Sequence, residues 1–297
     1  MRNLHLAKIG GIDLYLHWSW FLVALIEIQA RSGAYTSVVW NVAEYLALFA
    51  IVTVHEFGHA FACRSVGGRA DRIMLWPLGG IAFVDPPPRP GPVLWSIAAG
   101  PLVNVVLLWP LFQLSAWVAA LPGVDINLAL LAHSVAWINL ALLVFNVIPV
   151  YPLDGGQILQ SLLWFLIGRA RSLMAAAAIG IVGAGAFALY AFSVGNWLLV
   201  AIAAFVLMEC WNGWQRARGL WKLAKLPQRT GFACPDCRAT PPAGELWNCR
   251  QCGQPCDVFA TTGACPHCGA PLGRVVCPAC GHAHPLGHWV PEAVVLK

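Results

Sequence analysis

The stretch on which the interpretation of this chain depends is residues 51–59, IVTVHEFGH. It lies inside an apolar run, about Val38 to Ala62, that is long enough to cross a bilayer as a helix. On a helix, residues four positions apart lie on one face, so His55 and His59 can offer two imidazoles to one metal ion. Ionisable groups are costly to bury in an apolar span unless they are paired or used. The pattern therefore predicts a zinc site of the H-E-x-x-H kind, in which Glu56 takes a proton from zinc-bound water.

The composition is that of a membrane protein. Of the 297 residues, 59% are hydrophobic and only 10% are charged, whereas soluble proteins carry about 25% charged residues. Fifteen tryptophans also suit a membrane interface. The formal net charge of +5 lies mainly in short loops between apolar runs, so we expect a lipid bilayer around the chain and no nucleic acid partner.

Apolar runs of spanning length recur along the first part of the chain. The six runs cover about residues 14–30, 38–62, 93–121, 128–150, 173–192 and 197–211. Residues 158–167 are too short to cross, and we expect them to continue the fourth helix or to lie at the interface. Residues 73–76 and 80–84 predict a hairpin or re-entrant loop at the membrane surface. The predicted fold class is an all-α polytopic membrane protein with about six transmembrane helices, a short membrane-surface β-hairpin and a small cytoplasmic zinc-ribbon domain.

Lysine and arginine are concentrated in alternate loops. The predicted cytoplasmic set is Arg2, Lys8, Arg64, Arg69, Arg72, Arg89, Arg169, Arg171, Arg216, Arg218, Lys222 and Lys225. The opposite loops carry only Arg31. Because such residues favour the cytoplasmic side, we expect an integral protein of the cell membrane with both termini cytoplasmic. The segment Met1 to Gly10 has no long apolar stretch, so we do not expect it to be a signal peptide.

A catalytic zinc ion needs a third protein ligand and one open position. Asp154 is the best candidate, in residues 149–156, PVYPLDGG, at the end of the fourth apolar run. The prolines and glycines there break the helix, so the carboxylate can turn inward at the depth of His55 and His59. The alternative is a turn aspartate that caps the next helix.

Residues 55–59, followed about a hundred residues later by residues 145–156, FNVIPVYPLDGG, resemble the site-2 protease family of intramembrane metalloproteases. Residues 10–20 also resemble the start of that family's first span, and the resemblance covers about residues 10–211. It implies a membrane-embedded zinc held by His55, His59 and Asp154, with Glu56 as general base and acid. It also implies hydrolysis of peptide bonds in or near transmembrane segments of substrate proteins, often after an earlier cut by another protease.

The same resemblance suggests residues that would bind substrate. Asn146 would hold the substrate or the developing oxyanion, although a helix–helix hydrogen bond is an equally good interpretation. Gly80 and Ile81 lie in a segment that resembles the family's membrane-surface strand, which pairs with substrate by main-chain hydrogen bonds. A plain surface hairpin is the competing interpretation. Asn104, in residues 100–104, GPLVN, we interpret as structural or as supporting the metal ligands.

Nine of the eleven cysteines fall between Cys234 and Cys280, where the chain is polar and rich in Pro and Gly. We therefore predict two domains, a transmembrane metalloprotease domain at 1–225 and a tandem zinc-ribbon domain at 226–297. Each C-x-x-C knuckle places two thiolates on one metal, and four thiolates bind a structural zinc ion. The predicted pairing joins Cys234 and Cys237 with Cys249 and Cys252, and Cys265 and Cys268 with Cys277 and Cys280.

The pattern resembles a double zinc ribbon, so the expected metal content is one catalytic and two structural zinc ions. Disulfides are disfavoured because a cytoplasmic location is reducing. Cys256 is left over, either as a replacement for Cys252 or as a free thiol. His282, His284 and His288 follow the last knuckle, and we expect them to be solvent-exposed rather than to compete as ligands.

Two other functions remain open from the sequence. One is a membrane zincin whose third ligand is a glutamate on a later helix, but no suitable E-x-x-x-E or E-x-x-x-D follows His59. The other is a non-catalytic membrane adaptor that binds a cytoplasmic protein partner through its zinc ribbons. The presence of Glu56 between the two histidines favours the enzyme.

Overall fold

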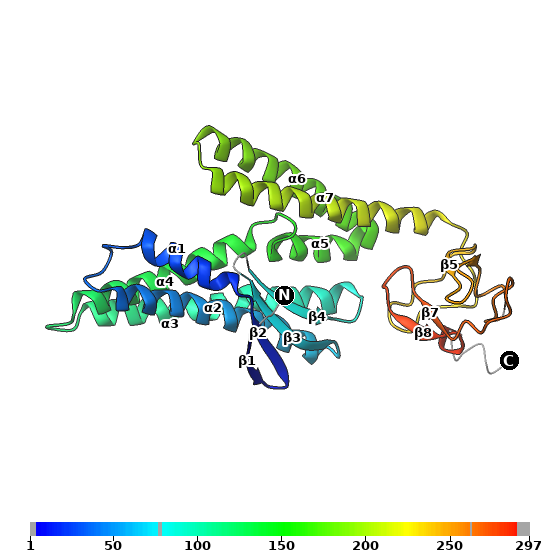
Figure 1. The fold of residues 1–297 in the computed structure, drawn as a ribbon, viewed down its shortest axis with the longest axis horizontal. Coiled ribbons are helices and arrows are strands. Elements are labelled where there is room, and N and C mark those ends of the chain that lie inside the picture. The colour runs from blue at the N-terminus through cyan, green and yellow to red at the C-terminus, as the bar shows by residue number, and fades with distance from the viewer. Residues whose placement is uncertain (1–3, 77–78, 262, 290–297) are drawn as a thin grey trace.

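The computed structural model describes residues 4–76, 79–261 and 263–289. Seven α-helices account for most of these described residues (Figure 1). They are α1 (Ser19–Ala30), α2 (Val38–Ser65), α3 (Pro90–Ala119), α4 (Ile126–Val147), α5 (Asp154–Ile167), α6 (Arg169–Ser193) and α7 (Trp197–Lys225). Within the described residues, five of these helices, α2, α3, α4, α6 and α7, are long and apolar enough to cross a membrane. The predicted polytopic helical fold is confirmed, with five such helices instead of about six.

The first predicted span is wrong in its boundaries. Its apolar run is divided between strand β2 (Ile12–Leu16) and α1, which has only 12 residues. Along β2 the side chains alternate between buried and half-buried, which is the pattern of a strand with one face against a core. Residues 158–167 also do not continue α4, because they belong to the separate helix α5.

A four-stranded sheet covers one end of α2. Its strands are β1 (Leu4–Ile9), β2, β3 (Arg69–Trp76) and β4 (Gly79–Asp85), in the order β1-β2-β3-β4. The antiparallel pair β3–β4 is the predicted hairpin, and β2 pairs with β3 in parallel. The buried face of β2 and β3 packs against the face of α2 that carries Phe57, Ala60 and Cys63. The sheet therefore braces the turns of α2 on which the histidines lie.

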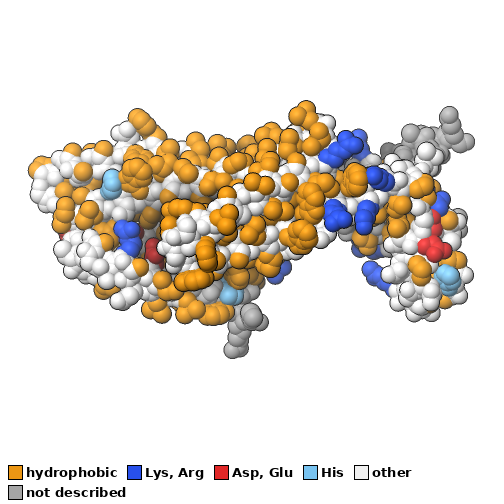
Figure 2. All heavy atoms as spheres, turned by 90° about the horizontal axis from the view of Figure 1, so that it is seen from above, with side chains coloured by type: hydrophobic (Ala, Val, Ile, Leu, Met, Phe, Trp, Pro, Cys, Tyr) orange, Lys and Arg blue, Asp and Glu red, His pale blue; other side chains and the backbone are white. Residues whose placement is uncertain are grey.

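The helices form two groups (Figure 1). Helices α1 to α4 lie side by side, while α6 and α7 form a separate hairpin that packs mainly against α5. Helix α5 in turn packs against α3. Figure 2 shows apolar side chains over most of this helical body, with lysine and arginine gathered where it meets the C-terminal module.

The segment that follows α7, which we call the cysteine module, contains little regular structure. It has the strand pairs β5 (Trp247–Asn248) with β6 (Pro255–Cys256) and β7 (Arg274–Val276) with β8 (Ala283–Pro285), then a short 3-10 helix, Leu286–Trp289. Its small core combines cysteines with Val258, Phe259, Val275 and Trp289.

Candidate metal centres

Three predicted ligands converge within the membrane-spanning part of the chain. His55 and His59 lie one turn apart on α2, and each is only 5% exposed. Asp154 is the first residue of α5. The two Nε2 atoms are 3.1 Å apart, and Asp154 Oδ2 lies 3.1 Å from Nε2 of His55 and 3.3 Å from Nε2 of His59. The break in the chain between α4 and α5 directs the carboxylate at the two imidazoles, as the sequence predicts.

The spacing of these three atoms fits a zinc ion. In a tetrahedral site with bonds of about 2.0–2.1 Å, ligand atoms lie about 3.3 Å from one another. The three separations, 3.1, 3.1 and 3.3 Å, are close to that edge length. Two imidazole nitrogens and a carboxylate oxygen are also a donor set that zinc prefers, and three protein ligands leave one coordination position open.

Hydrogen bonds at the other ring nitrogens orient both imidazoles. Nδ1 of His55 lies 2.6 Å from Asn104 Oδ1, and Nδ1 of His59 lies 2.9 Å from the carbonyl oxygen of Ser96. Because both partners are acceptors, each Nδ1 carries the proton and each Nε2 keeps a lone pair for the metal. Asn104 thus contacts a predicted ligand, which is one of the two roles that the sequence left open.

Asn139 of α4 completes this network, and sequence reasoning missed it. Asn104 Nδ2 donates to Asn139 Oδ1 at 2.8 Å, and Asn139 Nδ2 donates to the Asn104 carbonyl at 2.9 Å. Both asparagines are fully buried. The available signal was a polar residue inside an apolar span, which is costly unless it is paired.

Glycine makes room for the ligands on α3. A Cβ atom on Gly100 would lie 2.2 Å from His59 Nε2 and 2.7 Å from His55 Nε2. On the facing helix, a Cβ on Gly58 would lie 2.8 Å from the Ala99 carbonyl oxygen. Small residues therefore allow α2 and α3 to approach closely.

The remaining predicted residues lie around this centre. Glu56 is buried, and a carboxylate oxygen lies within 4.8 Å of the ligand atoms of both histidines. Asn146 is half-buried in the last turn of α4, and among the described residues no hydrogen-bond partner of its side chain is found. In β4, Gly80 and Ile81 pair with Leu75 and Met74 of β3. In the described part of the chain, no strand pairs with the other side of β4.

The cysteines form two four-sulfur clusters, but the predicted pairing of the knuckles is wrong. One cluster contains Cys234, Cys237, Cys277 and Cys280, and the other contains Cys249, Cys252, Cys265 and Cys268. The first knuckle thus pairs with the fourth and encloses the pair of the second and third. The reason is tertiary: the Ala233 N–H donates to the Trp289 carbonyl at 2.7 Å, which closes the two ends of the module on each other.

Both clusters fit zinc. Sulfur atoms of paired knuckles lie 3.7 Å apart, for example Cys234 from Cys280 and Cys252 from Cys265. Zinc–sulfur bonds of about 2.3 Å in a tetrahedron place sulfurs about 3.8 Å apart. Cys256 lies outside both clusters, and its Sγ donates to the Trp247 carbonyl at 3.3 Å. Burial and the neighbouring ligand thiols raise the pKa of the Cys256 thiol, which suits a free, protonated side chain.

Two of the trailing histidines are not simply solvent-exposed. His282 and His284 are half-buried, and both contact Asp236 Oδ2, through Nδ1 at 2.6 Å and through Nε2 at 2.7 Å. Partial burial opposes a positive charge on His282, but its hydrogen bonds to Asp236 and Asp85 outweigh this and raise its pKa. His288 is exposed, as expected.

Comparison with known proteins points to one protein family. Residues 43–124 and 123–190 match Peptidase family M50. A zinc metalloprotease of Methanocaldococcus jannaschii is 33% identical over 204 residues, which is 69% of this chain and 58% of that protein. Stage IV sporulation protein FB of Bacillus subtilis is 34% identical over 116 residues, 38% of each chain.

The fold is also similar to that of a solved structure. The match to the site-2 protease from Methanocaldococcus jannaschii covers 72% of this chain and 95% of that chain, at 30% identity and a TM-score of 0.53. Against the full-length zinc metalloprotease of that organism, the chain spans 58% of the relative's length.

Proposed function

The chain belongs to Peptidase family M50, the site-2 protease family, and from this premise we propose that it is a zinc metalloprotease of the membrane. It would hydrolyse peptide bonds in or near transmembrane segments of other proteins. The observation that carries the proposal is the triangle of ligand atoms from His55, His59 and Asp154, beside Glu56, on helices apolar enough to cross a bilayer. Buried ionisable groups at such a position are expensive unless they serve a function.

His55, His59 and Asp154 would hold the zinc ion. When bound, zinc supplies Lewis-acid chemistry, which lowers the pKa of a water molecule and polarises a carbonyl. Glu56 takes a proton from the attacking water, whose oxygen adds to the scissile carbonyl carbon. As the C–N bond breaks, Glu56 returns that proton to the leaving amine, and the products are a carboxylate and an amine.

The free edge of β4 is the proposed place for the substrate backbone. Carbonyls inside a helix are shielded by their own hydrogen bonds, so a transmembrane substrate must unwind before it is cut. An extended segment can then pair with the main chain at Gly80 and Ile81, as an added strand. The Asn146 amide has no partner among the described residues, so it is available to donate to the oxyanion that develops on the scissile carbonyl.

The remaining assignments follow from the membrane setting. We place the chain in the cell membrane with both termini and the cysteine module on the cytoplasmic side, because lysine and arginine gather where the module begins (Figure 2). We assign one catalytic and two structural zinc ions per chain, since the membrane centre and the two four-cysteine clusters each have the donor set and spacing that zinc prefers. We also assign residues 1–225 to the protease domain and 226–297 to the zinc-ribbon domain.

The test compares cleavage of a panel of single-span reporter proteins by the purified protein and by Glu56→Gln, with zinc measured in both. We expect about three zinc ions per chain in each protein, one in the membrane centre and one in each four-cysteine cluster, and cleavage only by the unaltered chain. Retained cleavage in Glu56→Gln would exclude this glutamate as the base. Absence of cleavage with every reporter, despite a full membrane site, would favour a membrane adaptor that binds without cutting.

A further inference from the structure

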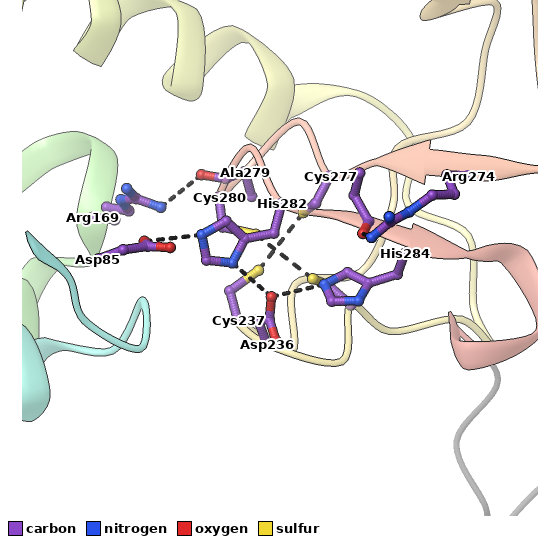
Figure 3. A network of polar contacts seen from close by, with 12 residues as sticks. Asp85, Arg169, Asp236, Cys237, Arg274, Cys277, Ala279, Cys280, His282 and His284 are labelled. Atoms are coloured by element: carbon purple, nitrogen blue, oxygen red, sulfur yellow. Dashed lines mark hydrogen bonds and ion pairs between the residues drawn. The ribbon is translucent and has the colours of Figure 1, made fainter. Parts of the chain in front are cut away.

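The cysteine module contacts the β4 strand and helix α6 through one short loop (Figure 3). This loop, residues 277–282, is the fourth zinc knuckle and the residues that follow it, and we call it the latch loop. His282 Nε2 lies 3.0 Å from Oδ1 of Asp85, the last residue of β4. Arg169 Nη1, from the first residue of α6, donates to the Ala279 carbonyl at 2.6 Å. One loop therefore joins the end of the free edge strand to the start of the α6–α7 hairpin.

These two elements pack against the two helices that supply the metal ligands. Strand β4 belongs with the sheet and α2, which carries both histidine ligands. The hairpin packs on α5, whose first residue is Asp154, and on the loop before it, where the Cys210 thiol donates to the Tyr151 carbonyl at 2.7 Å. A change in the position of the hairpin relative to β4 would alter both the space beside the free edge of β4 and the support of the third ligand.

The latch loop is stiff enough to act as a restraint. The Gly281 N–H donates to the Cys277 carbonyl and the Cys277 N–H donates to the His282 carbonyl, each at 2.8 Å. Asp236 holds the His282 ring from the other side. Arg169 is itself positioned by α5, because its guanidinium lies 5.2 Å from the centre of the Trp164 ring.

The attachment is also weak enough to be released. Within the described ranges, the polar contacts between the module and the helical body are those made by Asp85 and Arg169, together with the Gln228 amide, which donates to the Leu223 carbonyl at the junction with α7. Beside Ala279 lies an open cleft of about 450 Å³, lined also by Arg171, Trp221 and Lys225. The module is thus not fused to the helices by a continuous apolar interface at this place.

We propose that the latch loop restrains the opening of the α6–α7 hairpin away from β4, and thereby limits the entry of a substrate segment to the edge of β4. The restraint is a property of the fold alone, while its effect on entry rests on the proposed protease function. A cytoplasmic protein that binds the module could then control proteolysis by pulling this loop away from Asp85 and Arg169.

The first measurement is amide hydrogen exchange on the full-length protein in lipid nanodiscs, for the double variant Asp85→Ala/Arg169→Gln. We expect exchange in β4 and in the first turns of α6 to become roughly five- to tenfold faster, because two hydrogen bonds that hold them are lost. Exchange within the cysteine module should not change. Two single variants serve as controls: Arg274→Gln, whose side chain donates to Ala283 inside the module, and Arg171→Gln, on the same turn of α6. If the double variant exchanges like these controls, the latch loop does not restrain the opening.

The second measurement is the initial rate of reporter cleavage by the same variants. The double variant should cleave faster than the unaltered chain, while Arg274→Gln and Arg171→Gln cleave at the unaltered rate. Faster exchange with equal or slower cleavage would overturn the control of entry. If no protein cleaves any reporter, the proposed function fails separately. In that event, cross-linking of the reporter to β4 measures entry, and an unchanged yield in the double variant overturns the proposal.

Discussion

The membrane metal centre and the sulfur clusters of the module hold their ligands by opposite means. In the membrane centre, long helices determine where His55, His59 and Asp154 lie, and hydrogen bonds to the other ring nitrogens fix the imidazoles. In the module, the strands are only two or three residues long, and cysteines make up much of the core. Helix packing therefore forms the first kind of site before metal arrives, whereas metal must form the second kind.

The largest effect that this comparison predicts comes from removing sulfur ligands. The double variant Cys237→Ser/Cys277→Ser should lose at least one zinc ion per chain and unfold the module, because structural zinc contributes about 10–16 kcal/mol, more than a small core can replace. The measurement is zinc content together with amide exchange around Val258, Phe259 and Trp289.

Its counterpart is His59→Ala in the membrane centre. That variant should lose one zinc ion and all cleavage, yet keep the helical circular dichroism and the protection of the module. A module that stays protected without Cys237 and Cys277, or a helical body that unfolds without His59, would remove the contrast between the two kinds of site.

A smaller effect, confined to the membrane centre, is expected from Gly100→Ala. The added methyl group would lie 2.2 Å from His59 Nε2, so the imidazole must move out of the ligand triangle. We expect zinc affinity at this centre to fall by at least about 100-fold, the upper range for disturbing residues that support a ligand, with both sulfur clusters still filled.

Gly185→Ala on α6 is the matched control, because a Cβ there meets nothing within 4 Å. It should keep zinc and cleavage, and a helical alanine in place of glycine stabilises the helix by up to about 1 kcal/mol. Full zinc binding by Gly100→Ala would show that the ligand triangle tolerates displacement, so that the helices do not fix the centre as tightly as the comparison states.

The two regions also differ in how far sequence reasoning reaches. His55 and His59 are predictable because helix periodicity relates residues four apart, and Asp154 because prolines and glycines interrupt an apolar run at the same depth. The strand Ile12–Leu16 could not be recognised from the sequence because it is followed closely by the apolar residues of α1. A single apolar run in the sequence therefore covered two elements of the structure. The role of Asn139 could not be predicted for another reason. Its hydrogen-bond partner, Asn104, is 35 positions away, so no local pattern relates the two residues.

The pairing of the cysteine knuckles lies beyond any local pattern. All four knuckles have the same C-x-x-C spacing, so the spacing predicts that each contributes two ligands but cannot select a partner. The choice is made by the contact between Ala233 and Trp289, at opposite ends of the module. The sequence also left Cys256 open as a replacement for Cys252, and this ambiguity can be tested directly.

The smallest effect is expected from Cys256→Ser. Cys256 pairs with Trp247 across the β5–β6 strands and is fully buried, and its thiol donates to the Trp247 carbonyl. A serine hydroxyl can donate to the same carbonyl, so we expect the zinc content to stay unchanged and the module to lose only about 1 kcal/mol of stability, because a more polar group is buried. Cys252→Ser is the matched variant. Cys252 lies four residues before Cys256, between β5 and β6, with its sulfur 3.7 Å from that of Cys265, and its substitution should release the inner zinc ion. Zinc loss in Cys256→Ser, with full zinc in Cys252→Ser, would exchange the two assignments. Cys249 Sγ lies 3.7 Å from Cys268 Sγ and would still join the second knuckle to the third, so that result would change one ligand of the inner cluster and leave the nested arrangement in place.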